Sequence, residues 1–358
     1  MVILTEALLY PSLALLLGGL ILYGIPAQRR PAIHLPKPLL AGSALMVGLL
    51  SFGPVYTIVR FLAEASGFWA TMKEVLFGFQ VGQAWWFTLA ISIVLFLMIS
   101  FNDLSQNPRL ARIGVGWAGV LLLLMGWASH AASQAPAAGF VAHSLHVAAV
   151  CTWSGILLVV GWFSSRATDW GKFLEWFTPV AISCVLVLIV AGLGLMQIIV
   201  PQYVNSWLLP YGQALLLKHL LMVPLLWFAF INGFRRRARW QQDPNWNPLT
   251  GVRAEGMYIL LIFIATAIMG QQTPPHEVAE TMRTEPPSPL FAWLTGTVPD
   301  LPAQWAFTPI NGLTAVLALL FLGSLLMAER RRISASGMWG MGIGFVIAGF
   351  LTVLTALT

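Results

Sequence analysis

The sequence predicts an all-α membrane protein, a polytopic bundle of about ten transmembrane helices. Of its 358 residues, 58% are hydrophobic and only 9% are charged. Its apolar segments reach the ~20 residues that a helix needs to cross a bilayer. Because the hydrocarbon offers no water to the backbone, such a chain crosses either as helices or as a closed barrel. The long segments lack the alternating pattern of barrel strands, which leaves helices.

Hydropathy marks ten apolar segments along the chain. They lie at about residues 3–24, 39–62, 84–101, 113–129, 143–163, 179–200, 214–234, 257–271, 310–328 and 338–357. No basic region precedes the first segment, and no small-residue cleavage site with a soluble domain follows it. We therefore expect it to be a retained first helix rather than a signal peptide.

Basic residues gather in every second loop, after the first, third, fifth, seventh and ninth segments. These loops hold fifteen of the 19 Lys and Arg residues: Arg29, Arg30, Lys37, Arg109, Arg112, Arg166, Lys172, Arg235, Arg236, Arg237, Arg239, Arg253, Arg330, Arg331 and Arg332. The positive-inside rule assigns such loops to the cytoplasm, so both termini are expected on the outer, periplasmic side. The net charge of +6 therefore indicates topology, and no nucleic-acid partner is expected.

Two of the remaining connections stand out. Residues 67–83 mix aromatic and aliphatic side chains with Lys73 and Glu74, and we interpret them as a segment lying flat in the membrane interface. Residues 273–306 hold seven prolines and four acidic residues against the single Arg283. This composition predicts a semi-extended acidic spacer. The alternative is a segment that docks or captures a cation or a soluble carrier.

Histidines concentrate on the predicted outer half of the bundle, whereas His34 lies in a basic inner loop. The outer set is His130, His143, His146, His219 and His276. Ionisable groups at membrane depth are costly and commonly serve transport. His143 and His146 are three residues apart and so share one helix face. We predict a metal site formed by His130, His143 and His146, with His219 as a further ligand. The alternative is that each histidine is a polar helix end or an interhelical hydrogen-bonding group.

The helix that carries His146 also holds three residues of interest. Trp153 lies two turns deeper on the same stripe as His146 and is expected to floor a pocket. Gly155 lies on the opposite side, where the missing side chain admits a neighbouring helix. Cys151 is about 140° from His146, which excludes it from the same site on one helix. Cys151 and Cys184 are either small buried residues or a thiol pathway for copper.

The seventh segment contributes Lys218, His219 and Met222, the last two sharing a face. Imidazoles with an optional thioether suit copper, and imidazole alone also suits zinc or iron. Lys218 is expected to reach the headgroups, to pair with an acidic group such as Glu6, or to orient the histidines. At the start of the eighth segment, Glu255 is expected to pair with an arginine.

Three stretches together resemble the copper resistance protein D (CopD) family of bacterial inner-membrane proteins. They read HSLHVAAVCTWSGIL, PYGQALLLKHLLMVPLLWFAFING and RAEGMYILLIFIATAIMGQQTPP. The residues that carry the resemblance are His146, Trp153, Gly155, Tyr211, Gly212, Leu215, Lys218, Asn232, Glu255 and Pro274. The expected organisation is N-terminal helices at 1–127, a CopD-like core at 128–275, the acidic loop at 276–306 and two additional helices at 307–358.

The resemblance implies a non-enzymatic copper-handling protein of the bacterial inner membrane. It would take copper at the periplasmic face, in concert with a separate CopC-like carrier, and move the ion toward the cytoplasm. Two alternatives stay open. One is a redox protein in which His146 and His219 ligate a haem b from different helices. The other is a non-transporting assembly factor or copper sensor.

Overall fold

The computed structural model describes residues 2–164, 170–235, 247–296 and 301–357, and this part of the chain is helical without a β-strand. Ten helical stretches in it are long and apolar enough to cross a membrane, which confirms the predicted all-α bundle. They are Ile3–Gly24, Lys37–Ala65, Gln80–Phe101, Pro108–Trp127, Pro136–Phe163, Trp170–Ile199, Pro210–Arg235, Leu249–Met269, Pro309–Ala328 and Ala335–Thr355.

The chain divides into two compact units. The first comprises Met1–Ile198 with Gln242–Leu249, and the second comprises Ile199–Gln241 with Thr250–Thr358. The domain limits inferred from the sequence and the membrane side of each terminus stay predictions. Some residues used in those inferences lie outside the described part of the chain, namely Arg166, Arg236, Arg237, Arg239 and Asp300.

Helix α1 (Val2–Gly24) forms the core of the first unit, where Leu13, Leu16 and Leu20 are fully buried. It packs against α8 (Pro136–Phe163), the helix that carries His143 and His146. At the crossing, a Cβ on Gly18 or on Gly155 would overlap the backbone of the opposite helix. Two glycines thus let the backbones touch. The predicted close approach of a neighbouring helix at Gly155 is confirmed.

The second membrane-crossing stretch is broken in its middle into α2 (Lys37–Leu50) and α3 (Gly53–Ser66). Pro54 lacks an N–H and its ring clashes with the preceding turn, which interrupts the helix. The Phe52 N–H then bonds to the Leu49 carbonyl. The Gly48 carbonyl oxygen instead accepts hydrogen bonds from the Trp85 indole at 3.0 Å and the Ser51 hydroxyl at 3.0 Å. Side-chain donors thus replace the missing helical hydrogen bond to the Gly48 carbonyl.

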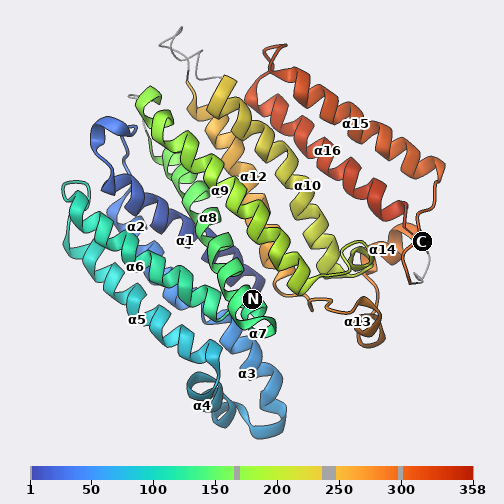
Figure 1. Cartoon of the computed structure of the whole chain (residues 1–358), viewed down its shortest axis with the longest axis horizontal. Helices are drawn as coiled ribbons and strands as arrows, with labels where there is room; N and C mark the ends of the chain where they lie inside the picture. The colour runs from blue at the N-terminus through green and yellow to red at the C-terminus, as the bar shows by residue number, and fades with distance from the viewer. Residues whose placement is uncertain (1, 165–169, 236–246, 297–300, 358) are drawn as a thin grey trace. The chain divides into compact units, whose positions relative to one another are not determined.

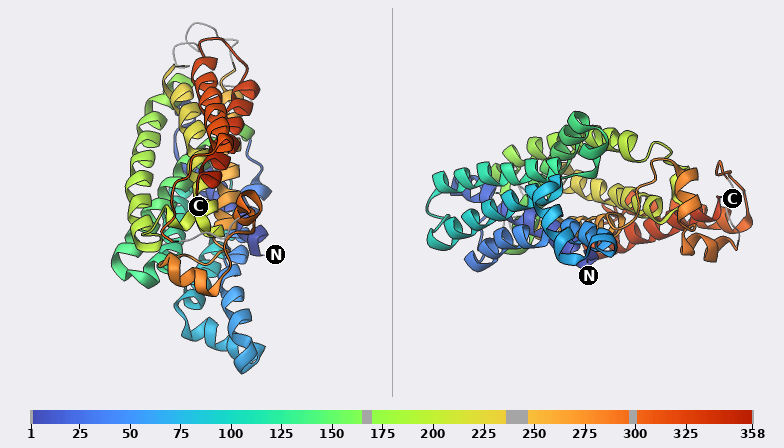
Figure 2. Two further views of the ribbon diagram at one scale, coloured as in Figure 1. Left: turned by 90° about the vertical axis from the view of Figure 1, so that its right-hand side faces the viewer. Right: turned by 90° about the horizontal axis from the view of Figure 1, so that it is seen from below.

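Within the first unit, α3 and α4 (Phe68–Gly78) extend beyond the ends of α1 and α6, as Figures 1 and 2 show. Val55, Val59 and Val75 form their small common core. The aromatic residues Phe61 and Trp69 are 82% and 80% exposed. Because α4 and the start of α5 cover most of it, the segment 67–83 is mostly helical. Its interfacial position stays a prediction.

The remaining helices of the first unit are α5 (Gln80–Phe101), α6 (Pro108–Trp127), the short α7 (His130–Gln134) and α9 (Trp170–Ile199). Helix α6 begins after Asn107, whose side-chain oxygen accepts the Leu110 N–H at 3.2 Å. Helix α7 begins after Ser129, whose hydroxyl accepts the Ala132 N–H at 3.2 Å. Both are favoured N-cap residues for a helix.

The second unit contains α10 (Pro210–Phe230), which continues as a π-helical turn (Ile231–Arg235), together with α12 (Leu249–Met269). The last two helices, α15 (Pro309–Ala328) and α16 (Ala335–Thr355), lie side by side in Figure 1. The Tyr258 hydroxyl donates to the Trp339 carbonyl at 2.7 Å. The Trp227 indole donates to the Leu325 carbonyl at 3.2 Å. These bonds attach α15 and α16 to α10 and α12.

The acidic segment 273–306 is not the semi-extended spacer that its composition predicted. Its described residues form α13 (Val278–Thr284) and α14 (Pro289–Thr295), and Phe291 is fully buried. The Ser288 hydroxyl donates to Gln213 Oε1 at 2.7 Å, and the Ser288 N–H donates to the Leu208 carbonyl at 2.9 Å. Apolar packing overrides the extended preference of the prolines and fixes the segment as a cap over the start of α10.

Candidate functional site

His143 and His146 both lie on α8, so their spacing of three residues puts them on one face. The helix begins at Pro136, about two turns before the segment read from hydropathy. The two histidines are therefore roughly 10 Å and 15 Å along the helix axis from its start. Both side chains are partly buried. They lie inside the helix rather than at its end.

The His146 ring packs against α9 at Gly192. A Cβ on Gly192 would lie 3.6 Å from His146 Cε1 and 3.7 Å from Nδ1, which is ordinary van der Waals contact. The ring thus faces α9 at Gly192, where an alanine would also fit. This partner on α9 could not be found from the spacing within α8.

His130 is the first residue of the short helix α7, and its side chain is exposed. Helix α7 packs against the first turn of α8, where a Cβ on Gly139 would overlap the Ala131 backbone. His130 thus enters from a separate short helix, not from the end of the preceding membrane span. All three predicted histidine ligands before residue 150 belong to the first unit.

Trp153 and Cys151 are buried further along α8, and Cys184 is buried on α9. Both cysteines are free thiols. Cys184 lies within hydrogen-bonding reach of the backbone of Trp153, two residues from Cys151 along α8. Cys184 therefore faces α8, whereas the Cys151 side chain leaves α8 roughly 160° away from Trp153, on the side of Gly155 and α1.

His219 lies in the second unit, on α10, and has a defined partner. Its Nδ1 is 2.6 Å from the Tyr203 hydroxyl, and the two rings meet edge to face with centroids 5.5 Å apart. Burial raises the pKa of Tyr203, so the phenol stays neutral at ordinary pH. Sequence reasoning missed this contact because sixteen residues separate the pair.

Lys218 and Met222 flank His219 on α10 and are both partly buried. Met222 shares the His219 face, as its spacing of three predicted. Whether Lys218 reaches headgroups or orients the histidines stays a prediction.

Glu255 has a defined partner among the described residues. Its carboxylate accepts a hydrogen bond of 2.9 Å from the Asn232 side-chain amide. The predicted pairing with an arginine stays a prediction, because Arg236, Arg237 and Arg239 lie outside the described residues. Glu255 is 2% exposed, and Asn232 lies in the π-helical turn that follows α10. The bond joins α10 to α12, so two residues of the family motif form one buried polar link.

Among the described residues, no group of three or more His, Cys, Asp or Glu side chains is arranged to hold a metal ion. The described structure therefore presents the predicted ligands as the α8 pair, the neighbouring His130 and the separate His219. Two imidazoles one helical turn apart are the closest association that the sequence spacing itself guarantees.

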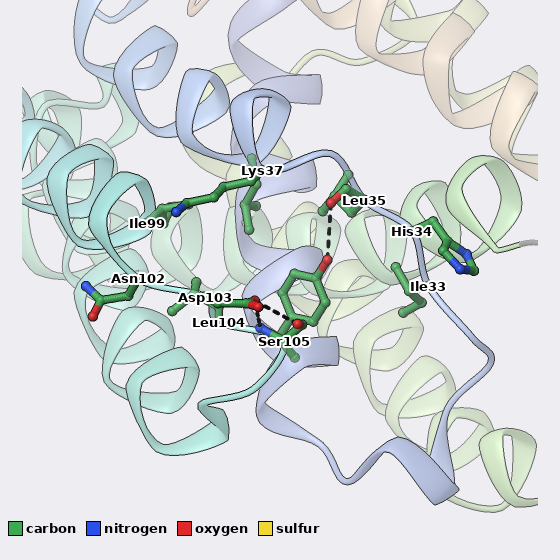
Figure 3. Close-up of a pocket in the computed structure, with 11 residues that line it drawn as sticks. Ile33, His34, Leu35, Lys37, Ile99, Asn102, Asp103, Leu104 and Ser105 are labelled. Carbon is green, nitrogen blue, oxygen red and sulfur yellow. Dashed lines mark hydrogen bonds between the residues drawn. The ribbon is translucent and has the colours of Figure 1, made fainter.

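A polar cavity of about 200 Å³ lies at the opposite end of the first unit, beside the loops that follow α1 and α5 (Figure 3). The Tyr23 hydroxyl donates to the Leu35 carbonyl at 3.2 Å. Asp103 accepts from the Ser105 hydroxyl at 2.7 Å and backbone N–H at 3.0 Å, which lowers the pKa of the carboxyl group. In Figure 3, the His34 ring points away from Asp103.

The comparisons with known proteins give one family and one named relative. A family model described as copper resistance protein D matches residues 171–269, within the predicted core. The copper transport protein CutJ of Bacillus subtilis (strain 168) is 26% identical over 296 residues. That match covers 76% of this chain and 53% of the relative, so the chain spans about half of the relative's length. No solved structure matches.

Proposed function

We propose that this multi-pass membrane protein binds copper and carries it across the membrane. The starting point is the match of residues 171–269 to the copper resistance protein D family. Copper is the substrate, captured by imidazoles and not consumed in a reaction, so the protein is a carrier rather than an enzyme. The relative named as a copper transport protein supports the choice of metal.

The observation that carries the proposal is the pair His143 and His146 on α8. Both are partly buried in an apolar helix, where an ionisable side chain is energetically costly and commonly serves a function. The His146 ring also faces α9 near Gly192. His130 of the first unit is the proposed additional ligand, and His219 of the second unit is proposed as a copper ligand in its own right, since imidazole nitrogens suit copper.

The proposed direction is from the periplasm to the cytoplasm of a bacterial inner membrane. This direction is what the family resemblance implies, and the charge pattern supports it only by assigning the histidines to the outer side and the basic loops to the inside. A separate periplasmic carrier of the CopC type is the proposed donor. Beyond the histidines, the buried free thiols of Cys151 on α8 and Cys184 on α9 are the proposed soft ligands along the path.

The test is metal analysis of the purified protein, with absorption spectra before and after reduction. We expect copper to co-purify with the wild-type protein and to be lost from the His143→Ala, His146→Ala double variant. His34→Ala is the matched control, because His34 is exposed beside the Tyr23 cavity. Copper retained in full by the double variant would reject the α8 pair. A Soret band of stoichiometric intensity would reject copper carriage in favour of the alternative, in which His146 and His219 ligate a haem.

A further inference from the structure

The contact between Tyr203 and His219 joins α10 to the connection that precedes it. The Tyr203 hydroxyl occupies Nδ1 of the imidazole at 2.6 Å. An imidazole has two ring nitrogens, so Nε2 is the atom that remains for a metal ion. The short distance and the edge-to-face ring packing together fix how the His219 ring is turned.

Tyr203 is itself held in place. Its ring packs edge-on against Trp207 with centroids 5.1 Å apart, and its backbone carbonyl accepts the Ser206 hydroxyl at 2.6 Å. The side chain also packs against the buried cluster of Val200, Tyr211 and Leu215. The phenol is therefore a fixed reference point for the imidazole and not a loosely placed surface group.

The proton between the two groups can be placed in two ways. If the phenol donates to Nδ1, the neutral imidazole carries its proton on Nε2 and offers no lone pair there. If Nδ1–H donates to the phenol oxygen, the Nε2 lone pair is free. Histidines that ligate metals usually donate their other N–H to a fixed acceptor, which sets the tautomer and the ring orientation.

We propose that Tyr203 is a positioning residue that presents Nε2 of His219 to copper. This inference rests on the proposed function and adds to it a residue that does not touch the ion. When copper binds, Nδ1–H donates to the phenol oxygen, and the phenol keeps its own proton. The imidazole is neutral in both tautomers, so the proton moves from Nε2 to Nδ1 and none is released to solvent.

The test compares Tyr203→Phe with Tyr211→Phe in the full chain, purified in detergent. Both changes remove one hydroxyl from the same apolar cluster, but only Tyr203 bonds to His219. Copper(I) affinity is measured by competition with a chelator. We expect Tyr203→Phe to weaken binding by roughly 10–100-fold, the usual effect of removing such a partner, and Tyr211→Phe to leave it unchanged.

A second readout needs no metal. The nitrogen shifts of His219 in ¹⁵N-labelled protein report the tautomer, and we expect Tyr203→Phe alone to change their balance. Unchanged affinity and unchanged nitrogen shifts in Tyr203→Phe would overturn the inference.

A His219→Ala variant separates this inference from the proposed function. If it loses copper while Tyr203→Phe does not, the positioning role is wrong and the ligand stands. If it binds copper as the wild type does, His219 is no ligand and the positioning role is overturned with it. In that case the α8 pair is judged by its own double variant.

Discussion

Replacing Gly155 by alanine is the sharpest test of the contact between α1 and α8. The new Cβ would overlap the Ala14 carbonyl oxygen and lie 2.9 Å from its carbon and 3.0 Å from the Gly18 nitrogen. Ordinary contacts between such atoms are roughly 3.5–4.0 Å, so relieving the overlap with the Ala14 oxygen requires the backbones to separate by more than about 1 Å. Overpacking of this kind costs ~1–3 kcal/mol, and the better helix propensity of alanine returns ~0.5–1 kcal/mol. We expect a net loss of roughly 1–2 kcal/mol.

The assay is reversible unfolding of the purified protein in mixed micelles, followed by tryptophan fluorescence. Gly116→Ala on α6 is the matched control, because no atom lies within 4 Å of the position a Cβ would take there. The control should gain about 0.5–1 kcal/mol, so the two substitutions should differ in sign. If Gly155→Ala is as stable as Gly116→Ala, the helices are not in backbone contact and the reasoning fails.

Three further outcomes are expected. Ser288→Ala removes the donor to the buried Gln213 side-chain oxygen and should cost ~1–3 kcal/mol of unfolding free energy; an unchanged denaturation midpoint would show that the cap is not held there. Cys151 and Cys184 are buried, so a water-soluble alkylating reagent should modify both only after denaturation, as mass spectrometry would show, and rapid labelling of the folded protein would contradict their packing. Trp293→Cys, at a position 79% exposed on α14, should react with an impermeant maleimide from outside intact cells, whereas labelling only after lysis would reverse the topology.

The sequence predicts the helices well because hydropathy over ~20 residues reports a single dominant cost, the exposure of backbone and polar groups to lipid. It predicts breaks and loops less well. Residues 39–62 read as one apolar run although Gly53 and Pro54 mark the interruption. Residues 273–306 read as an extended spacer because proline content says nothing about Phe291, whose burial depends on distant parts of the chain.

For the candidate site, spacing along α8 places His143 and His146 on one face, since the period of the helix is fixed. Contacts between elements are not encoded in this way. The pairing of His219 with Tyr203 and of Asn232 with Glu255 depends on how separate helices and connections meet. Glu255 shows the difficulty, because nothing in the sequence near it points to Asn232, 23 residues away, as the donor of its hydrogen bond.

The break between α2 and α3 has a consequence for how this chain can vary. Trp85 donates its indole proton to the Gly48 carbonyl, which the interrupted helix no longer supplies with its usual donor. The roles of Pro54 and Trp85 are therefore linked: the proline interrupts the helix, and the tryptophan supplies a donor to a carbonyl at the interruption. A related chain with an uninterrupted helix would not need the indole, and one that lost only the indole would leave the Gly48 carbonyl with the Ser51 hydroxyl as its remaining side-chain donor. We expect the two positions to change together across related chains, or not at all.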